Sequence, residues 1–179
     1  MNIIYSTGAG RTESVGSLES GPGNDMKLYL LERKLGLPIT VREAWDFFSN
    51  PANLTLITPP GLGFKMISEA PGRIHPGLIL SYELSPFFGL RVKWVTEITH
   101  VNEPESFVDD QRLGPYKFWH HEHIFKEIEG GVEVSDRVHY ALPLGPIGNI
   151  VHEFMVKKQL DEIFDYRGKY LEKKFGRVS

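Results

Sequence analysis

The segment from Gly63 to Leu142 constrains the fold most, because turn sequences such as APGRIHPG, NEPES and EGG divide it into short runs of β-branched and aromatic residues. These runs predict six strands, at about 63–69, 78–84, 91–101, 105–112, 116–127 and 132–141. Connections this short join antiparallel neighbours, since a parallel crossover needs a much longer connection. We therefore expect an antiparallel sheet made largely of consecutive hairpins.

The residues before this segment predict one further strand and two short helices. Lys27–Leu35 has the pattern of a strand. Thr40 followed three residues later by Glu43 forms a capping box, in which each side chain accepts the other's backbone N–H, so a helix should begin there. A polar residue before Pro51 predicts a second short helix that starts at this proline and runs to about Ile57.

The segment Ile150–Phe175 predicts a long amphipathic helix, since Gly168 is its only glycine or proline. Together these elements indicate an α+β helix-grip fold, a curved seven-stranded antiparallel sheet wrapped around a long C-terminal helix, with two short helices after the first strand. A strongly curved sheet cannot touch a straight helix everywhere, so we expect a cavity between them. The apolar residues of the helix recur near helical spacing: Val151, Phe154, Met155, Ile163, Phe164 and Leu171.

Composition suits one domain and excludes several functions. The 179 residues are 41% hydrophobic and carry a net charge of −3, which gives no general attraction to nucleic acid. The absence of cysteine excludes disulfides, thiolate catalysis and cysteine-ligated metals. No apolar run approaches the roughly 20 residues that span a bilayer, so we expect no stable membrane insertion.

The sequence divides into a domain and two tails. Residues 1–25 are rich in Gly and Ser without apolar periodicity, and we expect them to be disordered. The domain spans residues 26–175, with Met26 a second candidate for the translation start, and residues 176–179 form a C-terminal tail. The N-terminus lacks the features of a signal peptide, which predicts a cytoplasmic protein.

Three motifs carry a resemblance to a known family: LPITVREAWDFFSNPANLTLITPPGLGF, GPYKFWHHEHIF and SDRVHYALPLGPIG. With them the chain resembles the START-related SRPBCC superfamily, and most of all its bacterial ligand-binding and polyketide cyclase-like subgroup. The resemblance covers residues 26–175 and implies the helix-grip fold. It also suggests a partner enzyme of the short-chain dehydrogenase or epimerase type. It implies no reaction, because the superfamily includes transporters, hormone receptors and cyclases.

The stretch FWHHEHIF contains three of the seven histidines of the chain. The hairpin turn that follows sets a register in which His123 faces Asp136 and Trp119 faces Tyr140. His121 shares this face, which is otherwise apolar or aromatic. We expect this face to line the cavity, with His123 and Asp136 as a polar pair.

Three roles for this pair stay open. In the first, the two residues only meet each other's hydrogen-bonding needs inside the core. In the second, they contact a ligand. In the third, they catalyse proton transfer, with His123 or His121 carrying the proton and Asp136 orienting the imidazole. His121 and His123 are spaced as strand-borne metal ligands, but Asp136 is already engaged by His123. We therefore predict no metal, and no motif predicts a cofactor.

The same alternation extends the candidate ligand-binding set. The facing of Asp109 and Gln111, as against Asp110 and Arg112, stays open, because the LGPY turn allows more than one register. Phe87 and Phe88 form either an entrance or partner contact, or part of the core. The favoured function is binding of a small hydrophobic or amphipathic molecule, and the alternatives are a cyclase or dehydratase and an accessory domain of a partner protein. The expected ligand-binding residues are Tyr82, Trp94, Trp119, His121, His123, Asp136, Tyr140 and Phe154.

Overall fold

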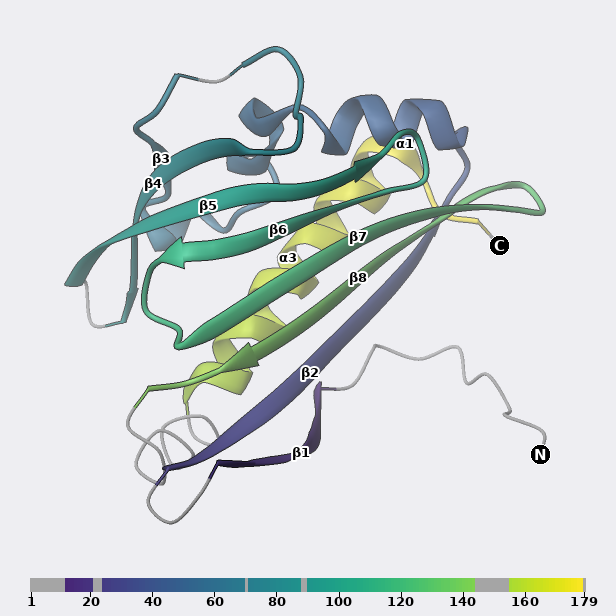
Figure 1. The fold of residues 1–179 in the computed structure, drawn as a ribbon. Coiled ribbons are helices and arrows are strands. Elements are labelled where there is room, and N and C mark those ends of the chain that lie inside the picture. Colours follow the sequence, from purple (N-terminus) through teal and green to yellow (C-terminus); the bar gives the residue numbers. More distant parts are fainter. Residues whose placement is uncertain (1–11, 21–23, 70, 88–89, 144–154, 179) are drawn as a thin grey trace, which may run out of the picture.

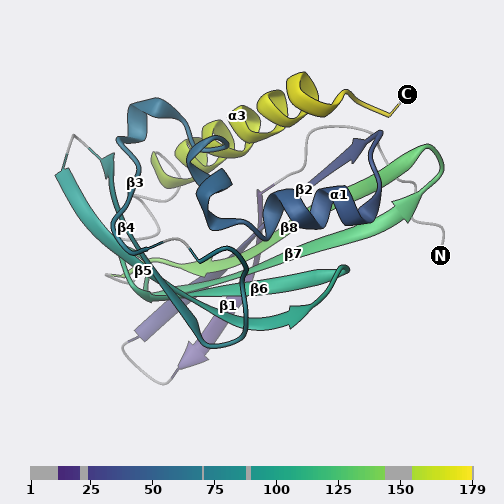
Figure 2. The ribbon, with the colours of Figure 1, turned by 90° about the horizontal axis from the view of Figure 1, so that it is seen from above.

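The computed structural model describes residues 12–20, 24–69, 71–87, 90–143 and 155–178. They form one curved antiparallel sheet and a long helix that lies against its concave face (Figures 1 and 2). The helices are α1 (Val41–Phe48), the 3₁₀ turns η1 (Pro51–Thr55) and η2 (Pro60–Leu62), and α3 (Lys157–Phe175). The strands are β1 (Thr12–Ser20), β2 (Asn24–Leu37), β3 (Lys65–Met66), β4 (Leu78–Phe87), β5 (Leu90–Asn102), β6 (Ser106–Leu113), β7 (Phe118–Ile128) and β8 (Gly131–Ala141).

The strand order is β1-β2-β8-β7-β6-β5-β4-β3, so consecutive hairpins build the sheet from β3 to β8 and β2 returns to pair with β8. All seven predicted strands are present, which confirms the predicted α+β helix-grip architecture. Within the part of the chain that the structure describes, no helix is long and apolar enough to cross a membrane.

The prediction of a disordered segment over residues 1–25 does not hold for Thr12–Ser20, which form an eighth strand. This strand pairs antiparallel with β2, from Thr12 opposite Leu31 to Ser20 opposite Asn24. The pairing uses the backbone groups that β2 presents at the sheet edge, and backbone pairing does not require an apolar pattern in the added strand. Composition alone therefore gave no signal for β1, and residues 1–11 lie outside the described part.

The two short helices begin where their caps predict. Thr40 Oγ1 accepts the backbone N–H of Glu43 at 3.1 Å, and the Glu43 carboxylate accepts the backbone N–H of Thr40 at 2.8 Å. Asn50 caps η1 by accepting the backbone N–H of Ala52 at 3.1 Å. The second helix is a 3₁₀ helix and ends at Thr55, two residues earlier than predicted.

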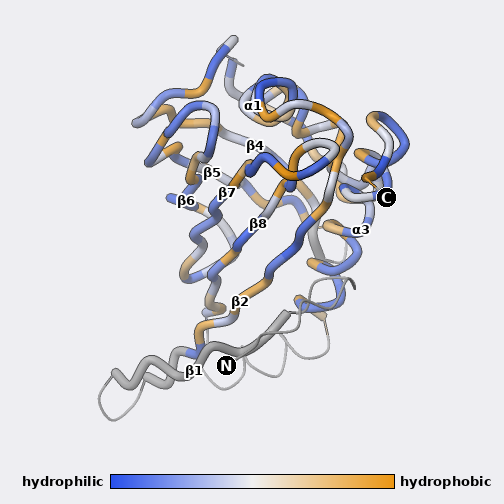
Figure 3. The backbone as a smooth tube through the Cα atoms, turned by 90° about the vertical axis from the view of Figure 1, so that its right-hand side faces the viewer, coloured by the Kyte–Doolittle hydropathy of each residue, from blue (hydrophilic) through white to orange (hydrophobic). Residues whose placement is uncertain are grey.

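The concave face of the sheet packs against α1 and α3 through two apolar clusters (Figure 2). The first cluster gathers around Trp45 of α1 and includes Phe125 of β7. The second lies further along the sheet and includes Trp119 of β7 and Phe164 of α3. Along β2 a hydrophilic stretch separates hydrophobic ones (Figure 3), which marks the boundary between the two clusters.

Candidate functional site

A layer of polar side chains separates the two apolar clusters on the concave face. On β7, Phe125 belongs to the first cluster and Trp119 to the second, while His121 and His123 lie between them. The neighbouring strands and α3 also carry polar side chains at about the same height along the sheet. These side chains therefore lie together in one layer. We call this set the polar layer; its other members are Thr96 of β5, Asp109 of β6, Asp136 of β8, Arg33 of β2 and Arg167 of α3.

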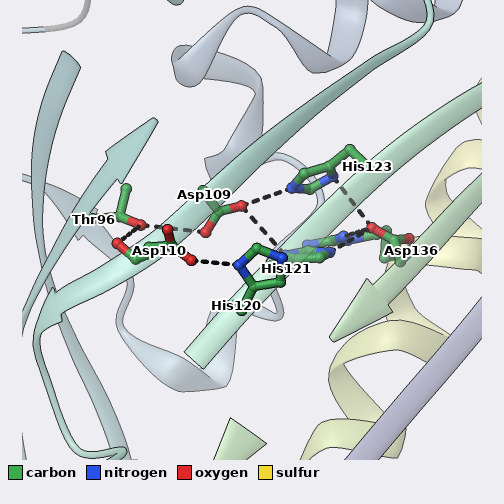
Figure 4. A network of polar contacts seen from close by, with 8 residues as sticks. Thr96, Asp109, Asp110, His120, His121, His123 and Asp136 are labelled. Carbon is green, nitrogen blue, oxygen red and sulfur yellow. Dashed lines mark hydrogen bonds and ion pairs between the residues drawn. The ribbon is translucent and has the colours of Figure 1, made fainter. Parts of the chain in front are cut away.

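Two imidazoles and two carboxylates form the centre of the polar layer (Figure 4). His121 donates its Nε2–H to Asp136 Oδ1 at 2.9 Å, and its Nδ1 lies 3.4 Å from Asp109 Oδ2. His123 donates its Nε2–H to Asp109 Oδ2 at 2.8 Å, and its Nδ1 lies 3.3 Å from Asp136 Oδ1 without a hydrogen bond. Each imidazole therefore lies between two carboxylates, and the two rings are 3.8 Å apart.

Side chains around this centre fix its orientation. Arg167 Nη1 donates to Asp136 Oδ1 at 2.8 Å, and the hydroxyl of Thr96 donates to Asp109 Oδ1 at 3.2 Å. The ring of Phe107 stacks on His123 with a centroid distance of 4.1 Å. Buried polar groups with several partners are held in one arrangement, which is the condition for a preorganised site.

The environment drives the pKa values of the two imidazoles apart. Burial and the neighbouring His123 lower the pKa of His121 below its ordinary value, and these effects outweigh the carboxylates of Asp109 and Asp136. Burial also acts to lower the pKa of His123, but the same two carboxylates outweigh it, so this pKa is raised. The protonated form is thus favoured at His123 and disfavoured at His121.

Both carboxylates stay ionised. Burial acts to raise the pKa of Asp109, but the two imidazoles and the Thr96 hydroxyl outweigh it and lower the pKa. The guanidinium of Arg167 and the imidazoles hold the pKa of Asp136 well below its usual range, against the opposing effect of burial. With His123 protonated, the two carboxylates are balanced by the imidazolium and the guanidinium.

The predicted register is confirmed, since His123 is opposite Asp136 and Trp119 is opposite Tyr140. The expected pair of His123 and Asp136 is present as a contact of 3.3 Å. The hydrogen bonds are distributed differently, because Asp136 accepts from His121 and Arg167, and His123 donates to Asp109. Side chains of diagonal neighbours on a sheet face are within reach of one another, and this allows the exchange of partners.

A cavity of about 180 Å³ lies between the concave face of the sheet, η1 and α3, beside the polar layer. Five of the expected ligand-binding residues line it: Tyr82, Trp94, Trp119, His121 and His123. Asp136 and Tyr140 are buried behind the lining and are not part of it. Phe154 lies outside the described residues, as does Phe88 of the expected aromatic turn.

The sequence left the facing of one residue of the candidate site open and did not identify another. Asp109 faces inward opposite His121, which settles the register that the LGPY turn left open. Arg167 lines the cavity and is buried, with 7% of its surface exposed. Its position was detectable in principle, because Leu160, Phe164, Arg167 and Leu171 follow helical spacing and place a charge within an apolar stripe.

Comparisons with known proteins show the fold. No family model and no curated protein sequence matches the chain. Protein CV1439 from Chromobacterium violaceum aligns with a TM-score of 0.63 and 12% identity, over 83% of this chain and 99% of that one. Protein Ms6760 from Mycobacterium smegmatis aligns with a TM-score of 0.58 and 18% identity, over 81% and 92%. The structure of Ara h 8.0201 aligns with a TM-score of 0.58 and 15% identity, over 82% of this chain and 99% of that one.

At these identities the alignments establish a shared architecture. The neighbours are consistent with the SRPBCC-like fold that the sequence motifs imply.

Proposed function

We propose that the protein binds a small, largely apolar ligand in the cavity between the sheet and α3, as expected for the ligand-binding subgroup of the SRPBCC superfamily. One observation carries the proposal: the cavity has mainly aromatic and aliphatic walls, and all of its charged and imidazole side chains belong to the polar layer. Sites for small molecules commonly combine such walls with a few placed polar groups, which orient the ligand.

The size of the cavity and its polar groups define the class of ligand. An apolar cavity of about 150 Å³ holds a molecule the size of benzene, and the cavity here measures about 180 Å³. The raised pKa of His123 favours its fully hydrogen-bond-donating form, and Asp109 is an acceptor, so a hydroxyl or carbonyl oxygen finds a partner there. The proposed ligand is about one ring in size and carries one such oxygen.

The test compares p-cresol with toluene, which has a similar shape without the hydroxyl. Nitrogen-15 NMR of the indole N–H groups reports binding, because Trp94 and Trp119 line the cavity. We expect p-cresol to shift these two signals with a lower dissociation constant than toluene. Ile163→Trp fills the cavity from α3 and should abolish the shifts, whereas Ile79→Trp, at an exposed position of β4, should not.

Two results would contradict the proposal. The first is the absence of a saturable shift with either compound in the folded wild-type protein. The second is binding that persists unchanged in Ile163→Trp, since the ligand would then lie elsewhere on the molecule.

The opposite pKa shifts of His121 and His123 favour a second candidate, a cyclase or dehydratase that acts on a carbonyl substrate. In that reaction His123 donates a proton, neutral His121 accepts one, and Asp136 orients His121. The test is a bell-shaped pH profile of turnover whose limb above pH 6.5 disappears in a folded His123→Ala variant. A partner enzyme of the short-chain dehydrogenase or epimerase type stays a prediction from the sequence resemblance.

A further inference from the structure

The geometry points to a binding site for one divalent transition-metal ion, which we propose is held by Asp109, His121 and His123. Each residue offers one ligand atom, and these three atoms lie within 4.8 Å of one another. The sequence predicted no metal because Asp136, the expected third ligand, was taken up by its pairing with His123. The structure brings a second carboxylate, Asp109, directly opposite His121.

The distances fit such an ion with small side-chain adjustments. Asp109 Oδ2 lies 2.8 Å from His123 Nε2 and 3.4 Å from His121 Nδ1. In a tetrahedral site with bonds of about 2.0–2.1 Å, ligand atoms are about 3.3 Å apart. An ion at the centre of the three atoms would take the place of the proton that His123 Nε2 donates to Asp109.

The surrounding residues already have the arrangement of a second coordination shell. His121 donates Nε2–H to Asp136 at 2.9 Å, which leaves Nδ1 with a lone pair directed toward Asp109. Asp136 is fixed by Arg167, and Thr96 occupies the other oxygen of Asp109. Ligating imidazoles commonly donate their second N–H to a carboxylate, which fixes the tautomer and ring orientation.

The ligand set and the cavity define the class of ion. Two imidazoles with one carboxylate suit Zn²⁺, Fe²⁺ or Co²⁺, whereas Mg²⁺ and Ca²⁺ prefer oxygen ligands. All three residues line the cavity, so the remaining coordination positions are open to a small molecule. Arg33 is paired with Asp161. With both imidazoles neutral, Asp109 and Asp136 therefore outnumber the Arg167 guanidinium by one charge, and a cation offsets this excess.

Cobalt provides the direct test, because four- and five-coordinate Co²⁺ absorbs visible light. The full-length protein is stripped with EDTA and titrated with Co²⁺ alone. We expect saturation at one ion per chain and displacement by Zn²⁺. His121→Ala and Asp109→Asn should lose the absorption. His120→Ala should retain the absorption, because His120 and Asp110 contact each other on the opposite, outward-facing side of β6 and β7.

Asp136→Asn keeps all three ligands and loses only the orienting carboxylate, so we expect Co²⁺ binding about 10–100-fold weaker. Thermal unfolding shows which variants are folded. If the ligand variants do not fold, the imidazole nitrogen-15 signals of the wild-type protein decide: Zn²⁺ should shift Nδ1 of His121 and Nε2 of His123.

The proposal is overturned if the wild-type protein shows no saturable Co²⁺ absorption. It is also overturned if folded His121→Ala and Asp109→Asn retain the absorption, or if Zn²⁺ shifts the signals of His120 in place of those two nitrogens. Because the titration contains no organic ligand, its failure leaves the proposed ligand binding untouched.

Discussion

Replacing Arg167 by methionine tests how a charged layer is kept inside an apolar core. The side chains of Arg167 and Asp136 are 9% and 8% exposed and are joined at 2.8 Å. Unit charges about 4 Å apart attract by about 4 kcal/mol at an effective dielectric constant of 20. Methionine keeps most of the side-chain volume but leaves Asp136 without its guanidinium, and removing one partner of a buried pair costs about 3–5 kcal/mol.

We therefore expect Arg167→Met to lower the free energy of unfolding by about 3–5 kcal/mol. Urea unfolding followed by tryptophan fluorescence measures this loss, and the melting temperature should fall by roughly 6–20 °C for a domain of this size. The control is Arg137→Met, since Arg137 is 45% exposed and pairs with Glu32 at 3.0 Å on the outer face. An exposed pair contributes about 0–1 kcal/mol.

A second variant separates the charge effect from lost packing. Asp136→Leu combined with Arg167→Met removes both charges, so it should cost less than the sum of the two single substitutions. The reasoning is refuted if Arg167→Met costs no more than Arg137→Met, or if the double variant loses the full sum.

Two further predictions concern pH dependence and the first helix. NMR titration should place the pKa of His123 above 6.5 and that of His121 below it. The raised pKa of His123 stabilises the fold fully below pH 6.5, and this contribution is lost as pH rises through the folded-state pKa. The advantage of the wild-type protein over His123→Gln in urea unfolding should shrink accordingly, and an advantage that grows with pH would contradict the assignment. Thr40→Ala removes the cap of α1 and should cost about 1 kcal/mol in the same assay, whereas Thr40→Ser keeps the capping hydroxyl and should leave the stability essentially unchanged.

The β7–β8 hairpin was predictable because a tight turn and strict alternation leave a single register. The sequence alone therefore places His121, His123 and Asp136 on the buried face, as the structure has them. The hydrogen-bond partners within the face were not predictable, because diagonal neighbours compete and side-chain rotamers decide between them. Asp136 thus bonds to His121 and Arg167, although it stands opposite His123.

The facing of Asp109 was not predictable because the LGPY turn between β6 and β7 can close in more than one register. The other neighbour of β6 offered no help, because the β5–β6 pairing shifts register twice, between Val95 and Thr96 and between Ile98 and His100. The sequence contains no signal that locates such irregularities. The contact of Arg167 with Asp136 was not predictable either, because it depends on which sheet residues α3 covers.

Native mass spectrometry of the purified protein tests the central claim, that the cavity binds a small molecule, most directly. We expect one small, largely apolar molecule per chain in the wild-type protein and in Ile79→Trp. We expect none in Ile163→Trp, because its new side chain occupies the cavity. An equal amount of the bound molecule in folded Ile163→Trp, or a wild-type protein that stays empty when offered p-cresol, would contradict the claim.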